Sequence, residues 1–385
     1  MMRVFGSVFV IHITQMEKNA KIYVAGHRGL VGSAIVRNLK KKGYTNIIGR
    51  SHKELDLCDQ RAVDAFFDEE KPEYVFLAAA HVGGIMANNT YRADFMLINL
   101  QIQNNVISAS QRTGVKKLMF LGSSCIYPRL APQPIKEEAL LTGELEYTNE
   151  EYALAKISGM RLCESMNLQY GCNYVAVMPT NLYGPNDNYD LVRSHVLPAM
   201  IRKMHLGHAL EENRWDDIRA DLDKRPVGDI NGKSSEEEIM AMLGKYGLNK
   251  AADGSVSLNL WGSGKPLREF LHSDDMADAC VYVMESVDFQ DIVKERGLEN
   301  NGADGKEIRN CHLNVGSGTE LHIAELAEIV KKTVGFKGAI NWDPTKPDGT
   351  PRKLMDVSRL ARLGWTYKIK LEEGIAGVYS EYCGK

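Results

Sequence analysis

A tyrosine and a lysine, Tyr152 and Lys156, lie four residues apart in a run rich in helix-forming residues. On an α-helix this spacing places both side chains on one face, one turn apart. A free phenol has a pKa of about 10, which is too high for efficient proton transfer at neutral pH. A lysine ammonium one turn away favours the phenolate and would lower that pKa. Because the same spacing occurs by chance on many helices, neighbouring residues must decide whether the pair is catalytic.

Two more candidates follow an apolar segment at 118–121 that predicts a buried strand. Ser123, at the carboxyl end of this strand, can donate a hydrogen bond to a substrate carbonyl that Tyr152 also holds. Cys125 could remove a proton beside that carbonyl, since a thiol of pKa about 8.5 needs only a modest downward shift to act as a base. Alternatively, Cys125 is a small buried hydrophobic residue, the commonest state of a free cysteine.

A glycine-rich turn predicts a cofactor site near these candidates. It follows a short strand predicted at 21–25 and precedes a helix predicted to end near residue 42. Strand, glycine turn and helix in this order are typical of dinucleotide binding. The first glycines allow a tight turn beside the pyrophosphate, the last lets the helix approach the sheet, and the helix N-terminus faces the phosphates. The turn comprises Gly26, His27, Arg28, Gly29, Leu30, Val31 and Gly32.

The residues at the predicted ribose position favour NADP(H) over NAD(H). A second predicted strand, 46–49, ends roughly 20 residues beyond the glycines, where an NAD-specific site has a carboxylate. At this point the chain instead carries Arg50, Ser51, His52 and Lys53. Together with Arg28 in the glycine turn, this positive charge suits a 2′-phosphate. We place Asp56 and Leu57 near the adenine edge rather than at the ribose.

Further apolar segments predict the rest of a parallel sheet. Residues 74–80 form a continuous apolar run, as expected for a strand buried on both faces. Because ligands bind outside the carboxyl ends of such strands, the loop at 81–89 should border the substrate. After a strand at 174–177 the chain continues with Pro179, Thr180, Asn181 and Leu182, which should contact the nicotinamide end of the cofactor. The pattern predicts an α/β fold, a doubly wound parallel (Rossmann) sheet with a smaller α/β C-terminal domain over the cofactor cleft.

Composition excludes several classes of function. The chain is 44% apolar and 25% charged with a net charge of -3, which gives no reason to expect nucleic acid or an anionic membrane as partner. The chain contains no run of about 18 apolar residues, so no transmembrane helix is predicted. Seven dispersed cysteines without a C-x-x-C pair indicate a reduced, cytoplasmic protein with no metal site. Residues 1–15, before Met16, are predicted to be an extension outside the fold.

The order of these motifs resembles the extended branch of the short-chain dehydrogenase/reductase superfamily, and within it the GDP-L-fucose synthase family. The stretches that carry the resemblance are 26–32, 78–85, 122–128, 178–185 and 346–353. The most discriminating is Ser123-Ser124-Cys125-Ile126-Tyr127. The resemblance covers nearly all of 18–380, with insertions near 205–256 and 288–310.

The resemblance implies a two-step reaction. Enzymes of this family epimerise C3 and C5 of GDP-4-keto-6-deoxy-D-mannose and then reduce the C4 ketone with NADPH to give GDP-L-fucose. By resemblance, Cys125 is the base and His195 the acid of epimerisation. Tyr152, Lys156 and Ser123 serve the reduction, in which Tyr152 gives the proton and Lys156 holds the ribose hydroxyls. His195 could instead be a capping or core histidine.

The resemblance also implies contacts to both ligands and to a second subunit. It places Leu121, Gly122, Ser123, Ser124, Lys156 and His195 beside the cofactor, and Lys203, Trp261, Arg268 and Asp348 beside the GDP-sugar. A guanidinium such as Arg268 suits a diphosphate, whereas Trp261 could simply pack. A homodimer is implied through helices near 94–112 and 151–169.

Two domains are predicted. Residues 16–185 form the NADP-binding domain, with return segments near 258–280 and 311–318. Residues 186–257 and 319–385 form the substrate-binding domain. Its insertion near 205–256 is expected to be a solvated, lid-like element, with a capped helix that begins after Ser235 and uses Glu238.

Two kinds of alternative stay open. One is another nucleotide-sugar epimerase or dehydratase of the same branch. A dehydratase should carry an Asp-Glu pair where this chain has Cys125 and Ile126, and a 4-epimerase should have an acidic residue near Arg50. The other is a non-catalytic NADP-binding scaffold, which predicts a broken Ser-Tyr-Lys set, whereas all three residues are present.

Overall fold

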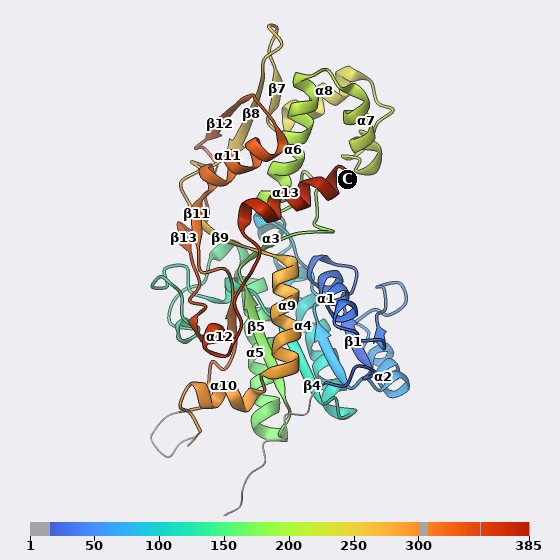
Figure 1. The fold of residues 1–385 in the computed structure, drawn as a ribbon, viewed down its shortest axis with the longest axis vertical. Coiled ribbons are helices and arrows are strands. Elements are labelled where there is room, and N and C mark those ends of the chain that lie inside the picture. The colour runs from blue at the N-terminus through green and yellow to red at the C-terminus, as the bar shows by residue number, and fades with distance from the viewer. Residues whose placement is uncertain (1–15, 300–306, 347, 385) are drawn as a thin grey trace, which may run out of the picture.

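A parallel sheet forms the lower part of the molecule (Figure 1). The computed structural model describes residues 16–299, 307–346 and 348–384, so the predicted extension at 1–15 lies outside the described residues. In the described chain this sheet has six strands in the order β10-β5-β4-β3-β1-β2. The strands are β1 (Ile22–Ala25), β2 (Ile47–Ile48), β3 (Tyr74–Leu77), β4 (Lys117–Leu121), β5 (Tyr174–Pro179) and β10 (Leu313–Val315). After β2, at one edge of the sheet, the chain crosses β1 and continues with β3 on its other side. The strand order therefore reverses between β1 and β3, and in such folds ligands bind at this point.

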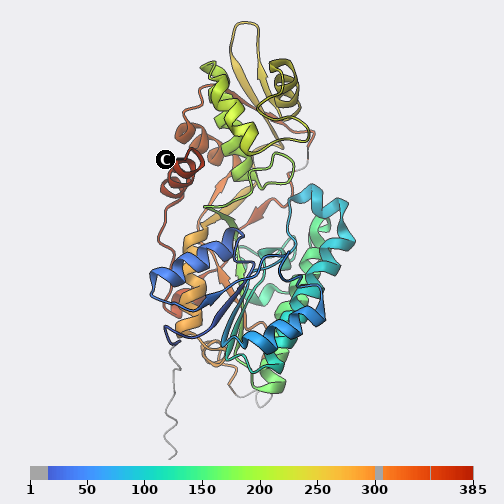
Figure 2. The same cartoon turned by 90° about the vertical axis from the view of Figure 1, so that its right-hand side faces the viewer.

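Alternate residues of β1 explain why both faces of this sheet are covered. Ile22 and Val24 point into one core, and Tyr23 and Ala25 into another. The first core is closed by α1 (Leu30–Lys41) and α9 (Ser273–Ser286), and the second by α2 (Gln60–Glu70), α4 (Arg92–Arg112) and α5 (Glu150–Tyr170). Figure 2 shows the sheet between these two helix layers. The predicted doubly wound Rossmann sheet is therefore confirmed.

The upper part of the molecule has its own core (Figure 1). Its sheet has the order β12-β8-β7, with β7 (Leu248–Lys250), β8 (Val256–Trp261) and β12 (Ala339–Asp343). Helices pack on it: α6 (Val196–Glu211), α7 (Trp215–Lys224), α8 (Glu236–Lys245), α11 (Ile323–Val334) and α13 (Leu371–Tyr382). A small sheet of β6 (Asn181–Tyr183), β9 (Leu267–His272), β11 (Glu320–His322) and β13 (Arg352–Lys353) joins the two parts.

Two segments lie outside their predicted domains. β8 pairs with β7 and β12 in the upper sheet, although residues from 258 were assigned to the lower domain. Conversely, α12 (Ser358–Arg362) packs with the lower part of the molecule, because Leu360 and the nearby Trp365 are buried in the same core as the apolar residues of α9. α10 (Phe289–Glu295) also packs there. Division into a cofactor and a substrate domain stays a prediction, with these boundaries shifted.

The segment near 205–256 is more deeply built into the fold than predicted. Ile218 and Leu222 of α7, and Ile239 and Leu243 of α8, are fully buried in the upper core. Only the polar faces of these amphipathic helices are solvated, so the expectation of a solvated lid is corrected. The predicted cap is confirmed: Ser235 Oγ accepts from Glu238 N at 3.3 Å, and Glu238 Oε2 accepts from Ser235 N at 2.8 Å.

A buried ion pair between α6 and α7 makes a testable contribution to stability. Arg202 Nε donates to Asp221 Oδ2 at 2.9 Å, and their side chains are 0% and 3% exposed. Asp221→Ala should lower the free energy of unfolding by about 3 kcal/mol, because it leaves a buried guanidinium uncompensated. Urea unfolding measures this loss. Asp217→Ala on the same helix is the matched control, since the exposed pair with Arg214 contributes less than about 1 kcal/mol. Equal losses would contradict this account.

Within residues 16–299, 307–346 and 348–384, no group of three or more His, Cys, Asp or Glu side chains could hold a metal ion. No helix in the same ranges is long and apolar enough to cross a membrane.

Candidate active site

A cleft of about 1950 Å³ runs along the carboxyl ends of β1, β3 and β4 and reaches the upper sheet. Pockets for a single drug-sized ligand measure about 300–1000 Å³, so this cleft has room for two nucleotide ligands. Every individual residue predicted to contact cofactor or substrate lines it, and so does the loop at 81–89 except for Ala87 and Asn89. The structure therefore brings the whole predicted set together, from both parts of the molecule.

The glycine turn between β1 and α1 fits a dinucleotide pyrophosphate. Gly26 has a φ of +81°, and a Cβ there would lie 2.8 Å from Ala79 N. A Cβ on Gly32 would collide with the carbonyl oxygen of Gly26, so only glycine lets α1 begin this close to the turn. His27 Nδ1 is buried without a hydrogen-bond partner in the described chain. The two glycines leave room for a pyrophosphate at the N-terminus of α1, where free backbone N–H groups can bind it. The His27 ring itself packs against Gly49, since a Cβ there would lie 2.6 Å from Nδ1.

The predicted cations at the ribose position divide into two kinds. Arg50 is engaged, because its Nη2 lies 2.6 Å from Glu70 Oε1. Arg28, His52 and Lys53 are exposed on the cleft wall. Asp56 accepts a hydrogen bond from Cys58 N at 2.9 Å and lies 3.7 Å from His52 Nδ1. Positive charge thus remains available for a 2′-phosphate at Arg28 and Lys53, with the His52 ring beside them.

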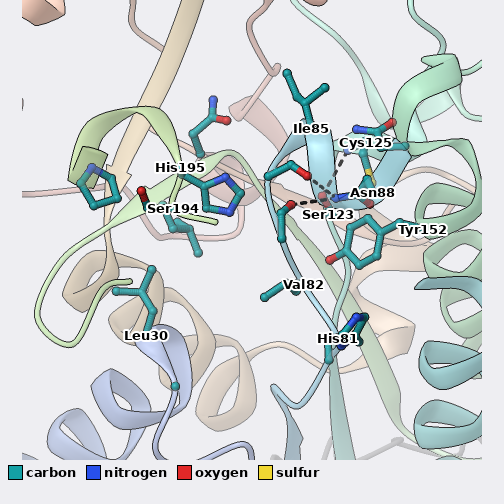
Figure 3. A pocket seen from close by; sticks show the side chains of 18 of the residues that line it. Leu30, His81, Val82, Ile85, Asn88, Ser123, Cys125, Tyr152, Ser194 and His195 are labelled. Atoms are coloured by element: carbon teal, nitrogen blue, oxygen red, sulfur yellow. Dashed lines mark hydrogen bonds between the residues drawn. The ribbon is translucent and has the colours of Figure 1, made fainter. Parts of the chain in front are cut away.

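The three residues predicted to serve reduction lie where β4 ends and α5 begins. Ser123 and Tyr152 lie beside each other on one wall of the pocket (Figure 3). Ser123 Oγ accepts a hydrogen bond from Cys125 N at 3.3 Å and opens a 3₁₀ turn, Ser124–Ile126. Lys156 is buried, and its Nζ donates to Leu121 O at 2.8 Å. The same Nζ lies 5.8 Å from the centroid of the Tyr152 ring, so the two side chains do share one helix face.

The electrostatics of Tyr152 differ from the prediction. Burial raises the pKa of Tyr152, the charge of a deprotonated Cys125 would raise it further, and a hydrogen bond with Ser123 opposes both. Lys156 does not reverse this, because its own burial lowers its pKa to about 8 and its ammonium is directed at Leu121 O. The expected low-pKa phenol is therefore wrong for this structure. A protonated phenol beside the cleft suits a proton donor better than a base.

The thiol of Cys125 also departs from expectation. Burial raises its pKa, whereas Lys353, a hydrogen bond with Ser123, and Lys156 act in the opposite direction. The modest downward shift that a base would need is therefore not present in this structure. The sulfur nevertheless lies in the cleft wall beside Ser123 and Tyr152, rather than in a sealed core (Figure 3).

His195 lies across the cleft from Cys125 and Tyr152 (Figure 3). Its backbone is the N-cap of α6, but its side chain makes no capping hydrogen bond. The ring is solvent-accessible through the cleft, and the surrounding protein atoms lower its pKa by desolvation. A neutral imidazole can both donate and accept a proton. The capping and core alternatives for this side chain therefore do not describe it.

Polar residues and one aromatic residue close the upper end of the cleft. Burial lowers the pKa of Lys203 to about 8. Burial also lowers the pKa of Arg268, whereas the negative charge of Asp348 raises it. Asp348 accepts two hydrogen bonds from Ser263, each 2.7 Å long. Trp261 is 62% exposed, so it does not serve as packing. This end can therefore take an anionic ligand with a flat ring system.

Lys353 and Glu146 also line the cleft, although neither was predicted as a site residue. Lys353 is desolvated there, which lowers its pKa, and the negative charge of a Cys125 thiolate would favour its ammonium. The signal for it was present, because Lys353 ends the stretch 346–353 that carries the family resemblance. Glu146, in contrast, stands in a loop without a motif.

The lowered pKa of Lys156 predicts a pH dependence of stability. Its pKa falls from 10.5 to about 8 on folding. Between these values the unfolded chain binds a proton that the folded protein has released, so the free energy of unfolding rises with pH in this window. The gain is at most about 3 kcal/mol. Thermal unfolding of wild type and Lys156→Met from pH 7.5 to 10.5 measures it. Parallel pH profiles of the two proteins would contradict the shift.

Known proteins that are similar in sequence carry names from the same class of enzyme. The model of the NAD dependent epimerase/dehydratase family matches residues 22–231 and 225–294. The chain is 50% identical to GDP-L-fucose synthase 1 of Arabidopsis thaliana over 366 residues, which are 95% of this chain and 94% of that protein. It is 46% identical to GDP-L-fucose synthase of Escherichia coli K12, over 93% of this chain and 95% of that protein.

Solved structures add a second group of relatives. The structure of a GDP-6-OMe-4-keto-L-xylo-heptose reductase from Campylobacter jejuni is 43% identical, with a TM-score of 0.87 over 96% of this chain and 99% of that chain. A GDP-L-fucose synthetase from Naegleria fowleri has 24% identity and a TM-score of 0.71 over 96% of this chain and 95% of that chain, which is a likeness of fold.

Proposed function

Because the chain belongs to the NAD dependent epimerase/dehydratase family and is 44–51% identical to several proteins named GDP-L-fucose synthase, we propose that it makes GDP-L-fucose from GDP-4-keto-6-deoxy-D-mannose. It does so by epimerising C3 and C5 and then reducing the C4 ketone with NADP(H). The observation that carries this proposal is that Cys125 and His195 face one cleft together with Ser123, Tyr152 and Lys156. A simple reductase has no use for the first two.

Epimerisation uses opposite walls of the cleft. Protons beside a ketone are acidic because the enolate places its charge on the carbonyl oxygen, which Ser123 and Tyr152 stabilise by hydrogen bonds. Cys125 removes a proton from one face of the sugar, and His195 returns one from the other. Lys353 and Lys156 favour the thiolate that this requires.

Reduction uses the set at the end of β4. Bound NADPH supplies the hydride. Tyr152 donates a proton to the C4 oxygen, and Ser123 holds that oxygen in place. Lys156 holds the ribose of the cofactor and is itself oriented by Leu121 O. Arg268 and Lys203 bind the GDP diphosphate, with Trp261 and Asp348 beside the rest of the nucleotide.

The cofactor preference is expected to depend on Arg28. Arg28→Met should weaken NADPH binding by about tenfold and leave NADH binding nearly unchanged, because only NADPH has the 2′-phosphate. Fluorescence titration with both cofactors measures this. Arg37→Met is the matched control, since Arg37 lies on α1 in an ion pair with Asp274. Equal loss for both cofactors would contradict a 2′-phosphate contact.

We further infer a cytoplasmic homodimer. Helices α4 and α5 pack against each other at the edge of the molecule (Figure 2) and leave Leu97, Leu154 and Leu168 exposed. An apolar outer face on two adjacent helices favours a second copy as its partner. The seven described cysteines are unpaired, as in a reducing compartment. Sedimentation analysis at micromolar concentration tests the dimer, and a monomer there would refute it.

The heptose reductases are the second candidate function. They are favoured by the higher TM-score of their structures, 0.87 against 0.71. The deciding assay supplies NADPH with GDP-4-keto-6-deoxy-D-mannose or with a GDP-4-keto-heptose and follows NADPH oxidation. The proposal requires the 6-deoxy substrate to give the higher kcat/KM and its product to be GDP-L-fucose. A higher kcat/KM for the GDP-4-keto-heptose would instead identify the protein as a heptose reductase.

A further inference from the structure

Three buried polar side chains form a chain that ends two residues from Cys125. The Tyr127 hydroxyl lies 2.9 Å from His312 Nε2 and 2.5 Å from Asn314 Oδ1. The three residues are 2%, 0% and 0% exposed, respectively. None of them lines the cleft, so none can touch the substrate.

The direction of each hydrogen bond follows from counting protons. Asn314 Nδ2 donates to Ile135 O at 3.0 Å and to Asp356 O at 3.1 Å, which uses both amide hydrogens and leaves Oδ1 as an acceptor. Tyr127 gives its one proton to this oxygen and must therefore accept from His312 Nε2. Burial and nearby arginines hold the pKa of His312 far below its usual value, so the ring is a neutral donor. Its other nitrogen, Nδ1, is buried without a partner in the described chain.

Tyr127 closes the short turn that carries the thiol. The backbone bonds of this turn are long, from Ile126 N to Ser123 O at 3.3 Å and from Tyr127 N to Ser124 O at 3.4 Å. Backbone bonding alone thus holds Cys125 weakly. The side chain of Tyr127 fixes the far end of the turn to β10, on which Asn314 lies.

Asn314 also holds the chain segment next to Lys353, the lysine that acts on Cys125. Ile135 N donates to Leu354 O at 2.8 Å, and Asp356 N donates to Ile135 O at 2.8 Å. These bonds, together with that from Asn314 to Asp356 O, fix the segment that follows Lys353. The buried side chain of Asn314, with its bonds to Tyr127, Ile135 and Asp356, therefore fixes the positions of both Cys125 and Lys353. The charge of this lysine acts to lower the thiol pKa.

We propose that Tyr127 is a positioning residue for epimerisation. Its anchored hydroxyl sets where the Cys125 sulfur lies relative to C3 and C5 of the bound sugar. Hydride chemistry depends instead on Tyr152 and Lys156 of α5 and on Ser123. Although Ser123 opens the turn, it directly follows Gly122, whose N donates to Val177 O of β5 at 2.8 Å and so fixes the near end of the turn independently of Tyr127. The inference rests on the proposed function, and it predicts that the two half-reactions respond differently to the loss of this one hydroxyl.

The test is Tyr127→Phe, which keeps the ring and removes the anchor. Exchange of the C3 and C5 hydrogens of the keto-sugar with D₂O, followed by NMR, should fall by about 10- to 100-fold, since a shift of about 1 Å can cost this much. Initial oxidation of GDP-L-fucose by NADP⁺, which needs no epimerisation, should change by less than about threefold. Tyr44→Phe is the matched control. Its buried hydroxyl also binds a side chain, Glu285 at 2.6 Å, but lies away from the cleft.

A second measurement needs no substrate. The pH profile of alkylation of Cys125 by iodoacetamide, read by mass spectrometry, should differ between Tyr127→Phe and wild type but not between Tyr44→Phe and wild type. An unchanged profile, or equal loss of exchange and hydride transfer in Tyr127→Phe, overturns the inference. Failure of the wild type to exchange either hydrogen overturns the proposed function instead, and the alkylation profile still decides the role of Tyr127.

Discussion

Tyr152→Phe should lower the rate of NADPH oxidation by about 10⁴-fold while the protein still binds NADPH with wild-type affinity. The substitution removes only a hydroxyl, and the edge contact of the ring with Phe95, 6.3 Å between centroids, is retained. Two functions are lost together: the proton for the C4 oxygen and one of its two hydrogen bonds. Stopped-flow absorbance at saturating substrate measures the hydride step.

Exchange at C3 and C5 should fall less, by about 10²-fold, because the enolate loses one stabilising donor but keeps Ser123, Cys125 and His195. Tyr170→Phe, at the exposed end of the same helix, is the control and should be silent. If reduction and exchange fell by the same factor, Tyr152 would act only as an oxyanion donor, and its role as the acid would have to be abandoned.

The parts of the site that follow from local sequence were predictable. The turn from Gly26 to Gly32 demands glycine for steric reasons that any strand-turn-helix shares, and Tyr152 and Lys156 share a face because an α-helix has 3.6 residues per turn. β3 ends at Leu77 rather than at Ala80, since the apolar run continues into the cleft wall. Pro179, expected beyond a strand, is the last residue of β5.

The parts that depend on long-range packing were not predictable. Whether the pKa of a thiol or phenol rises or falls depends on how much protein surrounds it. Burial outweighs Lys353 and Lys156 at Cys125, and it outweighs the hydrogen bond with Ser123 at Tyr152. The segment at 205–256 was predicted to be solvated because it is rich in acidic residues. Its apolar residues are scattered among them, and they form a core only where they pack against α6 and β8. α12 returns to the lower domain through Leu360 and Trp365, which no local pattern marks.

Cys125→Ser should separate the two reactions in the opposite sense. Exchange of the C3 and C5 hydrogens should fall by about 10³-fold, because a hydroxyl is a far weaker acid than a thiol and cannot supply the base at neutral pH. Oxidation of GDP-L-fucose by NADP⁺ should stay within about threefold of wild type, since Ser123, Tyr152 and Lys156 are intact. NMR in D₂O and cofactor absorbance measure the two rates.

The control for this change is Cys280→Ser, which alters a fully buried thiol on α9 away from the cleft. Its cost should be in stability alone, because a hydroxyl replaces a sulfur in an apolar core. A Cys125→Ser protein that still exchanged both hydrogens at the wild-type rate would remove this thiol from the mechanism and leave His195, on the other wall, to work with a different base. Loss of exchange at only one carbon would assign Cys125 to that carbon, because the two hydrogens reach the thiol only if the sugar can turn in the cleft.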